Sequence, residues 1–180
     1  YFQSALQAYG QPALMFSGGA TLGLFHSGVC KALFEEDLLP RVFSGSSAGS
    51  LMTGMVCTHT DAELMDLISG DGFYDYAFKF RSIMQILRDR TGIADIAVLK
   101  QFLRENLGEY TFKEAFERTG RHASVAIAPY EVGYQPRIMN ELTSPDLLMW
   151  SASLASCAVP LLFPPVRLTA KLQDGTYTPY

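Results

Sequence analysis

Two glycine-rich turns, each between a short apolar run and a helical stretch, limit what this chain can fold into more than any other feature. The first turn, residues 17–23, reads Ser-Gly-Gly-Ala-Thr-Leu-Gly and follows the apolar run Ala13–Phe16. The second turn, residues 45–49, reads Gly-Ser-Ser-Ala-Gly and follows residues 41–44. Strand, turn and helix thus occur twice in succession, which is typical of an α/β fold with a parallel sheet.

The rest of the sequence predicts more helices and a few further strands. Its apolar periodicity predicts helices over residues 22–36, 49–58, 61–68, 81–90, 98–107, 112–118 and 146–157, and strands over residues 41–44, 123–128 and 137–140. Ala13–Phe16 is short and apolar throughout, which is typical of a buried central strand. Thr111 and Glu114 form a capping box at the start of one helix.

Length and composition indicate one globular domain. Residues 1–4 look like the remnant of a cleaved tag, so we expect the domain to cover residues 5–180. No apolar run approaches the ~20 residues that a membrane-spanning helix needs. The net charge of −4 argues against a nucleic-acid partner. The three cysteines are odd in number and lack CxxC spacing, which predicts neither a disulfide framework nor a metal site.

Residues 45–49 match the Gly-x-Ser-x-Gly pattern of a nucleophile elbow. Small residues at Gly45 and Gly49 allow the sharp turn that leaves Ser47 exposed between a strand and a helix. The small residues of the first turn can direct backbone N–H groups at a developing oxyanion. A phosphate-binding loop is disfavoured, because Leu24 and Phe25 stand where that motif needs lysine and serine or threonine. The two turns together predict a serine hydrolase.

A serine nucleophile needs a base, and histidine is scarce here. His26, His59 and His122 all precede the last third of the chain, which disfavours a triad in the order serine, acid, histidine. A serine–aspartate dyad needs no histidine. The base therefore becomes the main question that the sequence raises.

Three separated motifs occur in order: residues 18–29 (Gly-Gly-Ala-Thr-Leu-Gly-Leu-Phe-His-Ser-Gly-Val), 44–50 (Ser-Gly-Ser-Ser-Ala-Gly-Ser) and 155–160 (Ala-Ser-Cys-Ala-Val-Pro). With them, residues 13–180 resemble the patatin-like phospholipases, and in particular the branch of bacterial secreted patatin-like lipases and eukaryotic triacylglycerol lipases. The resemblance implies a three-layer α/β/α fold with a mainly parallel central sheet. It also implies hydrolysis of lipid acyl esters by a Ser–Asp dyad, without metal or cofactor.

Carried over to this sequence, the resemblance makes Ser47 the nucleophile and Gly18, Gly19 and Ala20 the oxyanion hole. The family's second motif is an aspartate in Asp-Gly-[Gly/Ala/Ser/Thr], which Asp174 and the two residues after it match as a string. However, Asp-Gly between the strand-like runs 166–172 and 177–180 is also a strong hairpin signal, and we favour that interpretation. The dyad aspartate is then expected beyond Tyr180, with the domain incomplete at its C-terminal end.

The expected substrate is a phospholipid or neutral lipid at a membrane or micelle surface, with phospholipase A activity ahead of triacylglycerol lipase activity. The alternatives are a transacylase and a catalytically silent domain that binds lipid headgroups or serves assembly. Five aromatic residues within residues 73–80 form either a mobile cover near Ser47 or a core or dimer contact, so a homodimer stays open. The bacterial side of the resemblance favours secretion or the bacterial cell surface, with a cytoplasmic location as the alternative.

Overall fold

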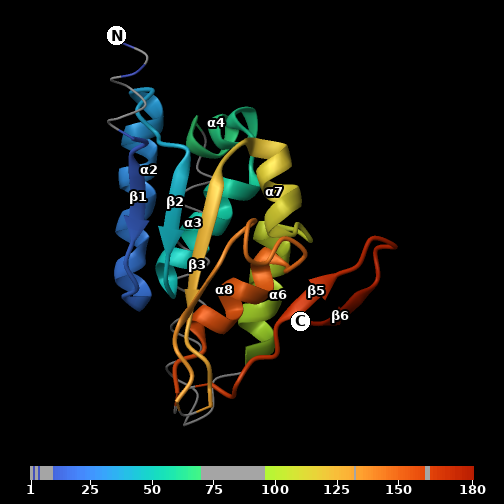
Figure 1. The fold of residues 1–180 in the computed structure, drawn as a ribbon. Helices are drawn as coiled ribbons and strands as arrows, with labels where there is room; N and C mark the ends of the chain where they lie inside the picture. Colours follow the sequence, from blue (N-terminus) through green and yellow to red (C-terminus); the bar gives the residue numbers. More distant parts are fainter. Residues whose placement is uncertain (1, 3, 5–9, 70–95, 132, 161–162) are drawn as a thin grey trace.

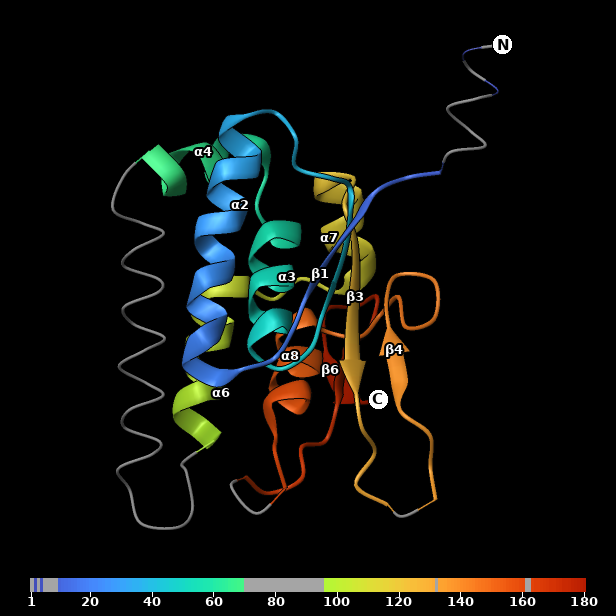
Figure 2. The same cartoon turned by 90° about the vertical axis from the view of Figure 1, so that its left-hand side faces the viewer.

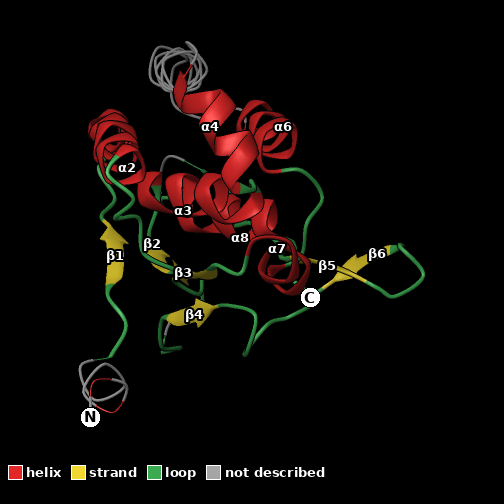
Figure 3. Ribbon diagram, turned by 90° about the horizontal axis from the view of Figure 1, so that it is seen from above, coloured by secondary structure: helices red, strands yellow, loops and turns green. Residues whose placement is uncertain are grey.

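A computed structural model describes residues 2, 4, 10–69, 96–131, 133–160 and 163–180. These residues form a four-stranded sheet, a separate two-stranded hairpin and a group of helices. Seen from above, the described helices lie on one face of the sheet (Figure 3). The predictions for residues 73–80 and 81–90 lie outside the described residues.

The sheet is mainly parallel, as the sequence predicts. Its order is β1 (Ala13–Phe16), β2 (Val42–Gly45), β3 (His122–Ile127) and β4 (Arg137–Met139). The first three strands run parallel, and β4 pairs antiparallel with β3 (Figure 1). Phe16 pairs with Gly45, so the carboxyl ends of β1 and β2 lie side by side. Each glycine-rich turn begins at one of these ends, and the register therefore brings the two turns together.

Helix α3 (Ala48–Thr58) is the centre of the domain. All its residues are buried, and it contacts strands β1, β2 and β3 as well as the helices around it. Figure 2 shows it between α2 and α8. The other described helices are η1 (Ala20–Leu24), α2 (Phe25–Glu35), α4 (Asp61–Ser69), α6 (Ile96–Leu107), α7 (Phe112–Thr119) and α8 (Met149–Cys157), and of these η1, α2, α6, α7 and α8 contact α3. An apolar helix of this kind is stable only inside a packed layer.

Local chemistry explains where α7 and the hairpin occur. The Thr111 side chain accepts the N–H of Glu114, and the Glu114 carboxylate accepts the N–H of Thr111, which confirms the predicted capping box. Strands β5 (Thr169–Lys171) and β6 (Tyr177–Pro179) pair antiparallel around the Asp-Gly turn, which confirms the predicted hairpin. This hairpin projects from the side of the domain (Figure 1).

Two predictions about elements are wrong in part. Strand β1 is the edge of the described sheet rather than a central strand, and its Met15 is 78% exposed. The helix predicted from residue 146 begins only at Met149, because the Leu148 N–H donates to the carbonyl of Thr169 and holds the chain extended.

No helix of the described residues is both long and apolar enough to cross a membrane.

Candidate active site

Ser47 stands in a strained turn between β2 and α3. Its φ of 49° and ψ of −123° place it in a region that residues with a side chain rarely adopt. The turn leads directly into the helix, since the Ser47 carbonyl accepts both the N–H (2.8 Å) and the hydroxyl (2.6 Å) of Ser50. The Ser47 side chain is half-buried, so it remains accessible from solvent. A strained, partly exposed serine between a strand and a helix is the geometry of a nucleophile elbow.

Gly45 and Gly49 are required by the closeness of the backbone around this turn. A β-carbon on Gly45 would lie 2.2 Å from the carbonyl oxygen of Gly49. A β-carbon on Gly49 would lie 2.2 Å from the carbonyl oxygen of Phe16, at the end of β1. Both distances are far below a van der Waals contact, so any side chain here would push the elbow away from the sheet.

The first glycine-rich turn lies directly against the elbow. A β-carbon on Gly18 would lie 3.2 Å from the β-carbon of Ser47. Gly18, Gly19 and Ala20 are all exposed, and neither the Gly18 nor the Gly19 N–H donates a hydrogen bond to another described residue. Ala20 shares with Ser47 a positive φ of 49°, so backbone strain gathers in these two turns. The structure therefore places unpaired backbone donors beside the candidate nucleophile.

His26 supports this turn from the start of α2. Its Nε2 lies 2.9 Å from the carbonyl oxygen of Ser17, so Nε2 carries the proton, because a carbonyl can only accept. The imidazole also packs against the Phe16 ring, with 5.1 Å between ring centroids. His26 has no predicted role, but in the structure its hydrogen bond to Ser17 holds the backbone next to Gly18 in place.

Ser156 is a site residue that the sequence analysis did not assign. Its hydroxyl accepts the N–H of Ser47 at 2.8 Å and donates to the carbonyl of Ala126 at 2.6 Å. Ser156 lies within the third resemblance motif, which was the one available signal. That motif does not predict that the hydroxyl contacts Ser47, which lies 109 positions earlier in the chain.

The thiol next to Ser156, that of Cys157, is buried. Burial raises the pKa of Cys157 to about 12, and hydrogen bonds to the side chains of Ser47 and Ser50 offset this only in part. The Cys157 thiol is therefore protonated at neutral pH, and a protonated thiol is a poor nucleophile. Ser47 is left as the candidate nucleophile of this region.

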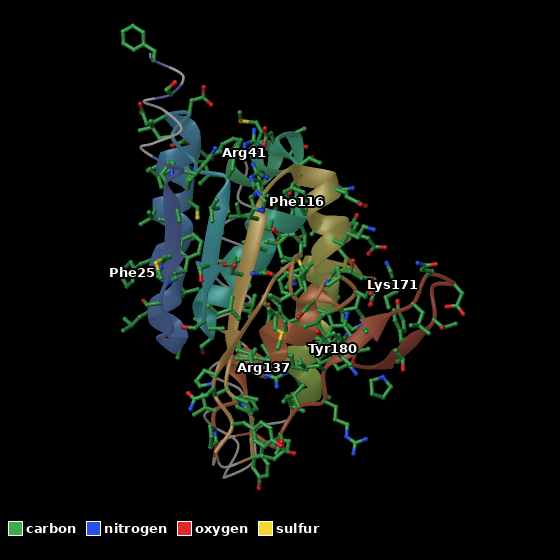
Figure 4. All side chains as sticks on the ribbon, in the orientation of Figure 1. Phe25, Arg41, Phe116, Arg137, Lys171 and Tyr180 are labelled. Carbon is green, nitrogen blue, oxygen red and sulfur yellow. The ribbon has the colours of Figure 1, made fainter. Side chains whose placement is uncertain are left out.

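Asp174 lies in the turn of the β5–β6 hairpin and makes its hydrogen bonds there. Its Oδ1 accepts the N–H (2.9 Å) and the hydroxyl (2.6 Å) of Thr176, and these bonds lower the pKa of Asp174. Figure 4 shows Lys171, the last residue of β5 before the hairpin turn, on the opposite side of the molecule from Phe25, which directly follows the first glycine-rich turn and η1. Within the described residues no carboxylate or imidazole forms a hydrogen bond with the Ser47 side chain. Nor does that part of the chain contain a group of three histidine, cysteine or acidic residues suited to a metal ion.

A family model described as patatin-like phospholipase matches residues 14–178, nearly the whole chain. The chain belongs to the patatin-like phospholipase family. Triacylglycerol lipase ptl2 of Schizosaccharomyces pombe is 37% identical to this patatin-like chain over 176 residues, which cover 96% of this chain and 28% of the lipase. Triacylglycerol lipase SDP1L of Arabidopsis thaliana is 38% identical, over 100% of this chain and 23% of its own length.

Solved structures show the same patatin-like fold. The crystal structure of VipD from Legionella pneumophila aligns with a TM-score of 0.53 at 14% identity, over 93% of this chain and 45% of VipD. The chain spans about a fifth to a third of the length of the curated relatives it matches. These relatives include fungal and plant proteins, and they give no support to the expectation of secretion.

Proposed function

We propose that this domain hydrolyses carboxylic esters of acylglycerol lipids, with Ser47 as the nucleophile. The observation that carries the proposal is the strained Ser47 at the start of α3, with the unpaired amides of Gly18 and Gly19 in the first glycine-rich turn (the Gly18 turn, residues 17–23) against it. The family and the names of the relatives support a lipid ester as the substrate. The exposed side chains of Leu22, within the first glycine-rich turn, and of Phe25, just after it, offer an apolar rim to a lipid at a membrane or micelle surface.

The hydrogen bonding around Ser47 supports a particular oxyanion hole. In some serine hydrolases the N–H of the nucleophile itself binds the oxyanion. Here the Ser47 N–H donates to Ser156, so it is already engaged. We therefore assign the oxyanion to the backbone N–H groups of Gly18 and Gly19, with Ala20 as a third donor.

The reaction then follows from the chemistry of an ester. The Ser47 Oγ attacks the acyl carbon while its proton passes to the base, and the carbonyl oxygen becomes an oxyanion held by the Gly18 turn. The bond to the glycerol oxygen breaks, and that oxygen takes the proton from the base. Water then attacks the acyl-serine with the same base as proton acceptor, which releases the fatty acid and restores Ser47.

The base is proposed to be an aspartate contributed from beyond Tyr180. Two observations support this. The Asp174 carboxylate is engaged with Thr176, and none of the three histidines forms a hydrogen bond with the Ser47 side chain. The resemblance to patatin-like enzymes implies an aspartate in that role.

Turnover by the full-length protein tests this proposal. We expect wild-type protein to release fatty acid from emulsified triacylglycerol and from phosphatidylcholine vesicles. The sequence resemblance places phospholipase A activity first, but the names of the relatives favour the neutral lipid as the preferred substrate. Ser47→Ala should lower the release by at least ~10³-fold, since it removes the nucleophile, while the unfolding midpoint stays near the wild-type value. Equal turnover by wild type and Ser47→Ala would contradict the proposal.

The same assay separates the alternatives. A transacylase would move the acyl group to an added acylglycerol rather than to water, which product analysis detects. If the domain only binds lipid, both wild type and Ser47→Ala would bind vesicles, and neither would release fatty acid. Either result would replace hydrolysis as the function.

A further inference from the structure

We propose that Ser156 is a positioning residue for the nucleophile, because its hydroxyl ties the backbone of Ser47 to the central sheet. The inference rests on the proposed role of Ser47 and deepens it. Ser156 lies in the last turn of α8, while Ser47 opens α3, so the contact joins two separate elements. Without the Ser156 hydroxyl, the Ser47 N–H would have no hydrogen-bond partner among the described residues.

The direction of the two hydrogen bonds is fixed by the atoms that take part. The Ala126 carbonyl can only accept, so the single hydroxyl proton of Ser156 points to it, over 2.6 Å. A lone pair of the same oxygen therefore faces the Ser47 N–H at 2.8 Å. Ala126 pairs with Ile138 of β4, so the chain of bonds ends inside the sheet. The nucleophile is thus anchored to a rigid element through one side chain.

This anchor acts on the part of Ser47 that needs it most. The residue holds a positive φ, a conformation that persists only where surrounding contacts enforce it. Its N–H lies at the N-cap of α3, where backbone donors have no partner inside the helix. When Ser156 accepts this N–H, it fixes the rotation of the peptide before Ser47 and with it the direction of the Cα–Cβ bond. That direction sets the angle at which Oγ meets the substrate beside Gly18.

Ser151 provides a matched control on the same helix. Its hydroxyl accepts the backbone N–H of Thr169 at 2.9 Å, and the residue is fully buried. Ser151→Ala therefore removes the same kind of bond, from a hydroxyl to a backbone N–H, but at the hairpin side of α8 rather than at Ser47. A general loss of stability should appear in both variants, and a loss of positioning only in the Ser156 variant.

The test measures how fast a fluorophosphonate labels Ser47 in the full-length protein. In this step the Ser47 oxygen bonds to phosphorus, fluoride leaves, and the serine proton passes to the base. We expect Ser156→Ala to slow labelling by about 10- to 100-fold, the size of effect that a small misplacement of a reacting group produces, with Ser151→Ala within twofold of wild type. For ester substrate, kcat should fall and KM should change little.

A second pair of variants keeps the test decisive if Ser156→Ala does not fold. Ser156→Thr and Ser156→Val have nearly the same shape, but only threonine retains the hydroxyl. We expect threonine to label near the wild-type rate and valine to label as slowly as alanine. Equal rates for the two, or equal slowing in Ser151→Ala, would overturn the positioning role. Wild-type protein that does not label at all would instead overturn the proposed function itself.

Discussion

The α-carbon of Gly18 faces the β-carbon of Ser47, and a methyl group on Gly18 would stand 3.2 Å from it. These two residues come from separate strand–turn–helix units, and the parallel pairing of Phe16 with Gly45 brings them together. A contact of 3.2 Å is tighter than an ordinary van der Waals distance, so one of the two residues would have to move. The closeness of the turns is what makes them one candidate site.

Gly18→Ala therefore tests the site rather than the fold. The φ of Gly18 is not in the left-handed region, so alanine adopts the backbone without strain. The added methyl group should displace Ser47 by a few tenths of an ångström and lower kcat by about tenfold or more. The unfolding midpoint should stay within a few degrees of wild type. A kcat unchanged from wild type would show that the Gly18–Ser47 contact has no catalytic importance.

Gly23 and Gly28 form a matched pair for a stability measurement. A β-carbon on Gly23 would lie 2.5 Å from the β-carbon of Ala48, whereas one on Gly28 meets no described atom within 4 Å. Gly23→Ala should thus destabilise the fold by about 1–3 kcal/mol through overpacking. Gly28→Ala, in the interior of α2, should stabilise it by roughly 0.5–1 kcal/mol. Urea unfolding checks both, and a reversed order would contradict the close packing of η1 on α3.

The lowered pKa of Glu63 predicts that the folded state becomes less stable in acid. The N–H of Thr60, and then the guanidinium of Arg118, lower the pKa of Glu63 from 4.5 to about 2 in the folded state. Since the folded pKa is the lower one, the carboxylate contributes stability above pH 4.5, and this contribution is lost as the pH falls towards 2. Glu63→Gln should lower the unfolding midpoint at pH 7 and flatten its decline between pH 4.5 and 2. The same decline in wild type and variant would argue against this role.

The three thiols should be nearly unreactive in the folded protein. Cys30, Cys57 and Cys157 are buried, and burial raises the pKa of each, to about 12 for Cys30 and Cys157. Little thiolate therefore forms at pH 8, and a thiol reagent reaches it only after unfolding. Peptide mapping after labelling in buffer and in urea measures this. Rapid labelling of any of the three in buffer would show that its surroundings open.

The parts of this structure that could be predicted from sequence are those fixed by neighbouring residues. The elbow at Ser47, the capping box at Thr111 and the hairpin turn at Asp174 each depend on a few consecutive residue types. Tertiary contacts decide the rest. Four apolar residues in β1 do not say that the strand lies at the edge of the described sheet.

The late start of α8 and the role of Ser156 are further cases. Helix α8 begins at Met149 because Leu148 bonds to Thr169, a residue of the next element along the chain. Ser156 reaches Ser47 only once α8 has packed against α3. No local periodicity signals either contact, because both depend on how distant segments pack.

Identification of the residue that reacts with a fluorophosphonate tests the central claim most directly. Full-length protein is labelled, digested and mapped by mass spectrometry, with Ser47→Ala alongside. We expect a single phosphonyl adduct on the peptide that contains Ser47, and none in the Ser47→Ala variant. An adduct at another serine that persists in Ser47→Ala, or no adduct in wild-type protein that hydrolyses lipid esters, would contradict Ser47 as the nucleophile.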